Sequence, residues 1–99
     1  MRHGAERGLI AAGVRVTSLH QTWRTSEKSR AALLHAIRDP DHSPEAARQL
    51  FGAVAGLVRA AGGSVPLDRN PMKDPLFRLY ADYFMGRALE EDFLLTMEY

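Results

Sequence analysis

Apolar residues recur every three or four positions over most of the chain, the spacing of helix faces that pack against a neighbour. The clearest stretch begins at Ser43-Pro44-Glu45, where serine caps a helix, proline fits its first turn and glutamate favours the positive dipole end. Gly62-Gly63 supplies the left-handed residue that often ends a helix. We therefore predict a helix over residues 43–61. Its apolar stripe comprises Ala47, Leu50, Phe51, Val54, Leu57, Val58 and Ala61.

Asp74-Pro75 repeats this start signal ahead of a second apolar stretch. Gly86 costs about 1 kcal/mol inside a helix, so the pattern predicts either one long helix or two with a bend there. The apolar positions cover more than one stripe, which is more surface than one neighbouring helix buries. They are Leu76, Phe77, Leu79, Tyr80, Tyr83, Phe84, Leu89, Phe93, Leu94 and Met97.

Two further elements are predicted in the first part of the chain. Thr25-Ser26-Glu27 offers a cap for a helix that Asp39-Pro40 ends. Its apolar residues are Ala31, Leu33, Leu34 and Ile37. Over residues 5–24 the apolar positions form a two-heptad seam of Leu9, Ala12, Val16, Leu19 and Trp23. Helix is favoured there, while the alternation over residues 14–17 leaves a strand as the alternative.

These elements predict an all-α fold, a small four-helix bundle or a three-plus-one variant of it, in which residues 1–99 form a single helical domain. The connection Gly62–Lys73 contains two prolines and is longer than the usual two to eight residues of a bundle. Long ordered loops often carry function, so Arg69 and Asn70 are a candidate loop site. The alternative is a strap that packs Val65 and Leu67 over the end of the bundle.

Charge is unevenly distributed although the formal net charge is only +1. Residues 1–38 hold seven basic and two acidic side chains, and the remainder holds six basic and ten acidic ones. Such a chain can pair head to tail with a copy of itself. The absence of cysteine excludes disulfides and thiolate zinc sites. No apolar run is long enough to span a membrane, and no secretory signal is visible, so we expect a cytoplasmic protein.

The sequence offers little catalytic chemistry. His20, His35 and His42 lack the four-residue spacing of metal ligands on one helix. No nucleophile elbow, phosphate-binding loop or dinucleotide fingerprint is present. We therefore predict no catalytic, cofactor or metal site, and favour a non-enzymatic protein. A small enzyme or ligand-binding protein remains an alternative, with a site at a subunit interface where His20 or His35 meets a carboxylate.

A nucleic-acid-binding protein of the helix-turn-helix type is the second alternative. The helices predicted after Thr25 and Ser43 would form the pair. Arg48 and Gln49 would then reach base edges, and Arg24, Lys28 and Arg30 would contact phosphates. Acidic residues in the turn oppose this interpretation, because phosphate binding requires a concentrated basic stripe.

The remaining features indicate a protein partner. Gly52 and Gly56 allow a close helix crossing, either within the chain or between two chains. Large apolar residues continue to the end of the chain, where most domains become polar. We therefore predict a non-catalytic interaction module that self-associates as a regulatory or accessory subunit. The expected partner-binding residues are Trp23, Gly52, Gly56, Tyr83, Phe84, Leu89, Phe93 and Met97.

Overall fold

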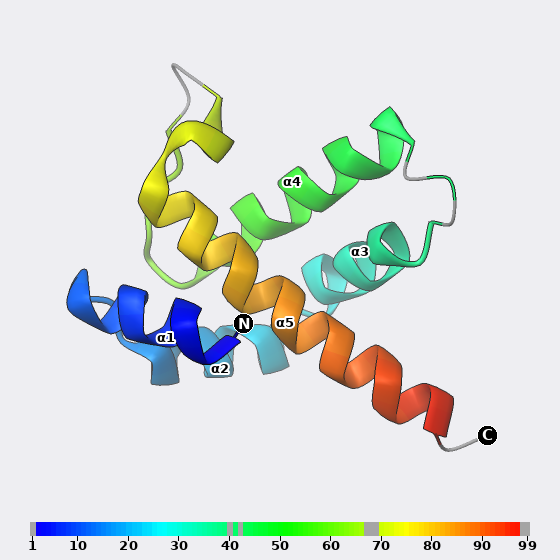
Figure 1. The fold of residues 1–99 in the computed structure, drawn as a ribbon, viewed down its shortest axis with the longest axis horizontal. Helices are drawn as coiled ribbons and strands as arrows, with labels where there is room; N and C mark the ends of the chain where they lie inside the picture. Colours follow the sequence, from blue (N-terminus) through cyan, green and yellow to red (C-terminus); the bar gives the residue numbers. More distant parts are fainter. Residues whose placement is uncertain (1, 40, 42, 67–69, 98–99) are drawn as a thin grey trace.

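The computed structural model describes residues 2–39, 41, 43–66 and 70–97, all of them in helices or the turns between helices. The all-α class is therefore confirmed. The described residues form five α-helices where four were expected, so the four-helix bundle is not confirmed. The elements are α1 (Arg2–Ala11), α2 (Val16–Thr25), α3 (Glu27–Ile37), α4 (Pro44–Ala60), a 3₁₀ helix (Pro71–Lys73) and α5 (Pro75–Met97), as Figure 1 shows.

The extra helix arises because the N-terminal segment is broken at Gly13. This glycine has a φ of +86°, a left-handed conformation that a helix interior does not allow. The amide of Val14 donates to the carbonyl of Leu9 at 2.9 Å, which closes the end of α1 as a Schellman turn. The prediction of one continuous seam was wrong, although Leu9, Leu19 and Trp23 are all buried in the core. The strand alternative is also wrong, since residues 16–17 begin α2.

The capping signals of the later helices are confirmed. The Ser43 side chain accepts a hydrogen bond from the amide of Ala46 at 3.1 Å at the start of α4. Asp74 accepts one from the amide of Leu76 at 2.9 Å at the start of α5. Helix α4 ends at Ala60, and Gly62 just beyond it has the left-handed φ of +86° that the glycine pair was expected to supply. Helix α5 runs without a break through Gly86, so of the two alternatives the single long helix is correct.

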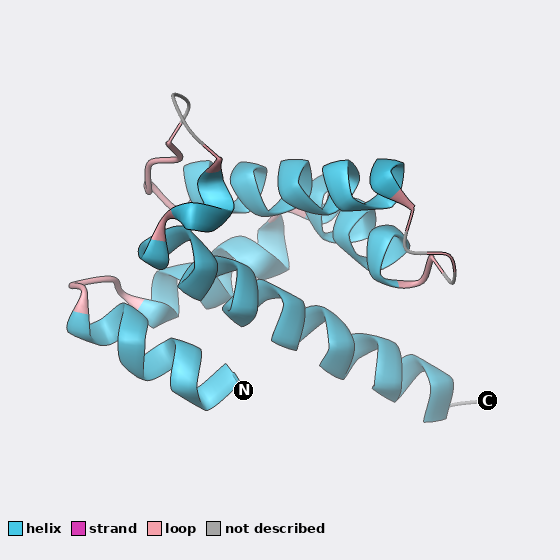
Figure 2. Cartoon of the chain, turned by 45° about the horizontal axis from the view of Figure 1, so that its top comes forward, coloured by secondary structure: helices cyan, strands magenta, loops and turns pink. Residues whose placement is uncertain are grey.

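Helix α5 crosses the molecule, and the other helices pack around it to form the core (Figures 1 and 2). Helix α1 lies so close to α5 that a Cβ atom added to Gly8 would be 2.9 Å from a methyl group of Leu79. Helices α3 and α4 form a neighbouring pair that also contacts α5. The largest fully buried side chains are Trp23, Tyr83, Phe84, Leu9, Leu19, Leu33, Leu57, Val54 and Val58.

Two side-chain contacts hold the later turns of α5 against the rest of the chain. The buried indole of Trp23 donates from Nε1 to Oε1 of Glu91 at 3.1 Å. The Arg38 guanidinium donates from Nε to Oδ1 of Asp92 at 2.6 Å. These contacts connect α5 to α2 and to the end of α3. The direction of this part of α5 is therefore set by the fold.

Candidate functional site

Three of the expected partner-binding residues belong to the core of the chain itself. Trp23, Tyr83 and Phe84 are fully buried. The ring centroids of Trp23 and Phe84 are 6.2 Å apart, and those of Tyr83 and Phe84 are 5.3 Å apart. In the folded chain these aromatic side chains pack against one another. Their proposed role as anchors for a partner is therefore corrected to a role in the core.

The expected residues near the end of α5 have a different environment. Leu89 is 48% exposed, an unusual position for a large apolar side chain. It lies about 200° around the helix from Glu91, at about 100° per residue, and so on nearly the opposite side from the contact with Trp23. The side chains of Phe93 and Met97 lie outside the described residues. Leu89 is thus available to a partner.

The two glycines of α4 have separate surroundings. A Cβ atom at Gly56 would be 3.0 Å from Oγ of Ser29, so this glycine serves the close approach of α3 and α4 within the chain. A Cβ atom at Gly52 would meet nothing within 4 Å. The crossing predicted for the pair is therefore intramolecular at Gly56, and Gly52 faces open space.

Gly52 lies in the wall of an apolar pocket of about 410 Å³, which we call the α4 groove. Helix α4 forms one side, and the chain that leads from α4 to the start of α5 forms the other. The aromatic rings of Phe51 and Phe77 stack within it, with their centroids 6.4 Å apart. The residues that line the groove are Phe51, Gly52, Ala55, Arg59, Val65, Pro66, Asn70, Pro71 and Phe77. Its volume falls within the range of ordinary ligand pockets, and its lining is mostly apolar.

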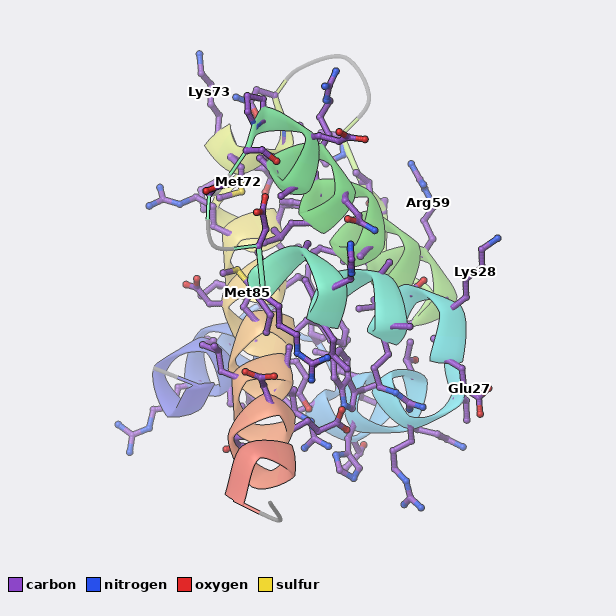
Figure 3. The ribbon with its side chains drawn as sticks, turned by 90° about the vertical axis from the view of Figure 1, so that its right-hand side faces the viewer. Glu27, Lys28, Arg59, Met72, Lys73 and Met85 are labelled. Atoms are coloured by element: carbon purple, nitrogen blue, oxygen red, sulfur yellow. The ribbon has the colours of Figure 1, made fainter. Side chains whose placement is uncertain are left out.

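A second hollow, with both polar and apolar lining, adjoins the groove. It shares Val65, Pro66 and Phe77 with the groove and adds Ser64, Asp74 and Leu76, of which Leu76 is 36% exposed. Met72, in the adjacent 3₁₀ helix, is 38% exposed and is labelled in Figure 3. Most of the large apolar side chains that remain exposed in the described residues are therefore either at this end of the molecule or at Leu89.

Among the described residues that line the groove, Arg59 is the charged one. It is exposed and projects outward from α4 (Figure 3). Among the described residues no hydrogen bond or ion pair involves Arg59. An acidic group on an occupant of the groove would therefore meet a cation that has no partner in the described part of the chain.

Of the two residues of the candidate loop site, the structure describes Asn70. Asn70 lines the groove, and its side chain accepts from the amide of Met72 at 3.1 Å, capping the 3₁₀ helix. Arg69 lies outside the described residues, as does Leu67 of the alternative strap. Val65 packs against the core, as the strap interpretation expected.

Sequence reasoning missed most of the groove. Phe51 and Phe77 were assigned to helix stripes, and Val65 to a strap. One signal was available: Arg48, Gly52, Ala55 and Arg59 recur at helical spacing, which makes a face of small residues between two arginines. Such a face leaves a shallow surface that a partner can approach closely.

A separate, polar pocket of about 430 Å³ lies where α3 leads into α4. Asp39 at its edge accepts hydrogen bonds from the amide and the hydroxyl of Ser43, at 3.1 and 2.8 Å. These bonds shape the turn. His35, also in the pocket wall, is exposed, as is His20 on α2, and His42 lies outside the described residues. Within the described part of the chain, no three acidic or histidine side chains gather as a metal site would require.

The basic residues of the nucleic-acid alternative are not gathered on one face. Both Arg30 Nη1 contacts go to main-chain carbonyls at the end of α2, those of Trp23 at 3.0 Å and Arg24 at 2.9 Å. Arg48 lies eight residues before Gly56, the point at which α4 meets Ser29, which is about 12 Å along the helix. It is therefore separated from Lys28 by most of the helix pair.

Comparisons of the chain with protein-family models, with curated proteins and with solved structures find no match. Over the residues that the structure describes, no helix combines the length and the apolar character needed to cross a bilayer. The surface of the chain itself is therefore the guide to its function.

Proposed function

We propose that this protein is a non-catalytic helical interaction module that associates with copies of itself, as a regulatory or accessory subunit, through the α4 groove. The observation that carries the proposal is the groove: aromatic and aliphatic side chains line an open hollow, and the described part of its wall includes the cation of Arg59. Contiguous exposed apolar surface on a small protein is typical of an interaction site. Phe51 and Leu76 would supply large apolar contacts of the kind that dominate interface energetics, whereas Phe77 is buried in the core.

The surroundings of the groove favour a protein occupant. Two walls of the groove come from α4 and the start of α5, and the N-terminus of each helix is capped by a side chain. These walls are therefore already ordered, and binding requires little further ordering of them. The exposed side chains of Leu76 and Met72 add apolar surface beyond the pocket itself. A partner segment that lies across both hollows would cover more of this surface than a small molecule in one of them.

Filling the groove from within tests the proposal. Because a side chain at Gly52 meets nothing in the folded chain, Gly52→Leu should occupy the groove and leave the fold intact. Gly4→Leu is the matched control, since Gly4 lies in α1 and also has open space around it. Sedimentation equilibrium from about 1 to 500 µM, the range of ordinary weak to moderate association, should show mass rising with concentration for the wild type and for Gly4→Leu.

Gly52→Leu should remain a monomer over the same range, with the helical circular dichroism of the wild type. A wild-type chain that is folded and monomeric at every concentration would refute self-association. Equal association of Gly52→Leu and Gly4→Leu would show that another surface is responsible.

A further inference from the structure

A pocket of about 350 Å³ lies where the turn between α1 and α2 meets the end of α4. We propose that this pocket binds the phosphate group of a small hydroxylated molecule. Of the residues that line it, Arg15 and Ser18 belong to the start of α2, Gly62 and Gly63 follow the end of α4, and Tyr80 belongs to α5. The pocket is separate from the α4 groove, so this inference goes beyond the proposed function.

The buried hydroxyl of Tyr80 is the observation that points to a ligand. Tyr80 is 5% exposed, and its hydroxyl makes no hydrogen bond with any of the described residues. The hydroxyl lies beside Gly63, where an added Cβ atom would be 3.1 Å from it, and both residues line the pocket. Buried polar groups are nearly always hydrogen-bonded, because an unpaired one loses its contact with water without replacement. A ligand in the pocket would supply the missing partner.

The start of α2 adds further donors that are unused within the chain. Helix N-termini attract anions, because their first amides lack partners within the helix. The N-cap residue Arg15 makes no side-chain cap, and the first turn of α2 contains no acidic residue. The side chains of Arg15 and Ser18 form no hydrogen bond or ion pair within the described part of the chain. The positive end of α2 is therefore neither capped nor neutralised by the residues that the structure describes.

The donors of the pocket favour phosphate over a carboxylate. One guanidinium, two hydroxyl groups and a helix N-terminus border it, and they come from two different helices. A phosphate group has three terminal oxygens that accept hydrogen bonds, whereas a carboxylate has two. Burial raises the pKa of Tyr80, so its hydroxyl keeps its proton at neutral pH and can donate to an anion. None of the described residues that line the pocket is acidic, so none would repel the phosphate.

The opposite wall of the pocket indicates the rest of the ligand. Ala61 and Gly62 follow the last turn of α4, where the final carbonyl groups of a helix lack partners within it. Carbonyl oxygens accept hydrogen bonds from hydroxyl groups and disfavour a second anionic group. The volume of the pocket also lies within the range of ordinary ligand pockets, which leaves room beyond a single phosphate group. The ligand is thus a phosphate ester with free hydroxyl groups.

An NMR titration of the isotope-labelled full chain with inorganic phosphate tests the site, with sodium chloride used to hold the ionic strength constant. The amide resonances of residues 15–18 should shift along one saturable curve, with a dissociation constant of about 1–10 mM for so small an anion. Glycerol phosphate, which carries two free hydroxyl groups, should bind about 10-fold more tightly. Acetate, with two oxygens, should bind more weakly than phosphate.

Single substitutions separate binding from folding. Tyr80→Phe removes the unpaired hydroxyl, so it should weaken phosphate binding by about 10-fold and still unfold at no lower a urea concentration than the wild type. Ser18→Ala should weaken binding as well. Arg15→Gln should weaken it by about 2–5-fold, a loss that shrinks as added salt screens the charge. Arg24→Gln, in the last turn of α2, is the matched control and should bind phosphate like the wild type.

The proposal is overturned if residues 15–18 show no saturable shift up to about 50 mM phosphate. Equal shifts at the starts of α3 and α4 would also overturn it, because they would show unspecific binding at helix ends. A Tyr80→Phe variant that binds phosphate like the wild type would remove the observation on which the site depends. Acetate that binds as tightly as phosphate would refute the assignment to phosphate, and glycerol phosphate that binds no more tightly would refute the hydroxylated ligand.

Discussion

The hydrogen bond between Trp23 and Glu91 should carry a measurable part of the stability of the fold. The indole is fully buried, and its Nε1 donates to the Glu91 carboxylate at 3.1 Å across 68 residues of sequence. Glu91→Ala removes the acceptor and leaves a buried donor unpaired, which costs about 1–3 kcal/mol in the free energy of unfolding. For a domain of this size each kcal/mol lowers the melting temperature by about 4–8 °C.

Urea unfolding followed by circular dichroism measures this loss. Glu91→Gln keeps an oxygen acceptor in place and should cost less than about 1 kcal/mol. Asp82→Ala, at an exposed position on the same helix, should change stability by no more than about 0.5 kcal/mol. In a Trp23→Phe background the donor is absent, so Glu91→Ala should then cost little.

Two results would contradict this reasoning. One is a Glu91→Ala variant within about 0.5 kcal/mol of the wild type, the size of an ordinary surface change. The other is an unchanged cost of Glu91→Ala when Trp23 is already phenylalanine. Either would mean that the end of α5 is held by contacts other than this bond.

The same substitution should have opposite effects at two glycines of the α4 region, as thermal melts would show. Gly52→Ala should raise the free energy of unfolding by about 0.5–1 kcal/mol, because it replaces a helical glycine without a clash. Gly62→Ala should lower it by about 1–2 kcal/mol, because a residue with a Cβ atom is strained at a φ of +86°. Burial raises the pKa of Tyr80, so stability should decline as the pH rises above about 10, and pH-dependent melts of Tyr80→Phe should lack this part of the decline. Arg59→Glu should weaken self-association at low salt, and light scattering should show the difference shrink as salt screens the charges.

Sequence signals confined to a few neighbouring residues were sufficient to predict where most of the helices begin or end. Ser43, Asp74 and Gly62 act through bonds or backbone angles within their own turn, so their roles could be predicted from the sequence. Gly13 was harder, because a glycine between two apolar stretches fits a helix interior or a helix end equally well. The structure shows that it ends α1, with a φ of +86° and hydrogen bonds of the turn back to Leu9 and Ile10.

The candidate site was less predictable, since periodicity identifies apolar faces but not what covers them. Tyr83 and Phe84 follow the same pattern as Leu89, yet the first two are covered by other helices of the chain and Leu89 is not. The α4 groove also required long-range information. Pro66 and Pro71 line it together with Phe51, from which they are separated by 15 and 20 residues of sequence.

The unbroken course of α5 has a geometric consequence for any assembly built from it. Its first turns form part of the groove and its later turns carry Leu89, so one rod fixes the rotation between the groove and this exposed leucine. One residue inserted between Phe77 and Leu89 would turn Leu89 by about 100° and advance it by about 1.5 Å relative to the groove. The relative orientation of these two features is thus encoded in the residue count of a single helix.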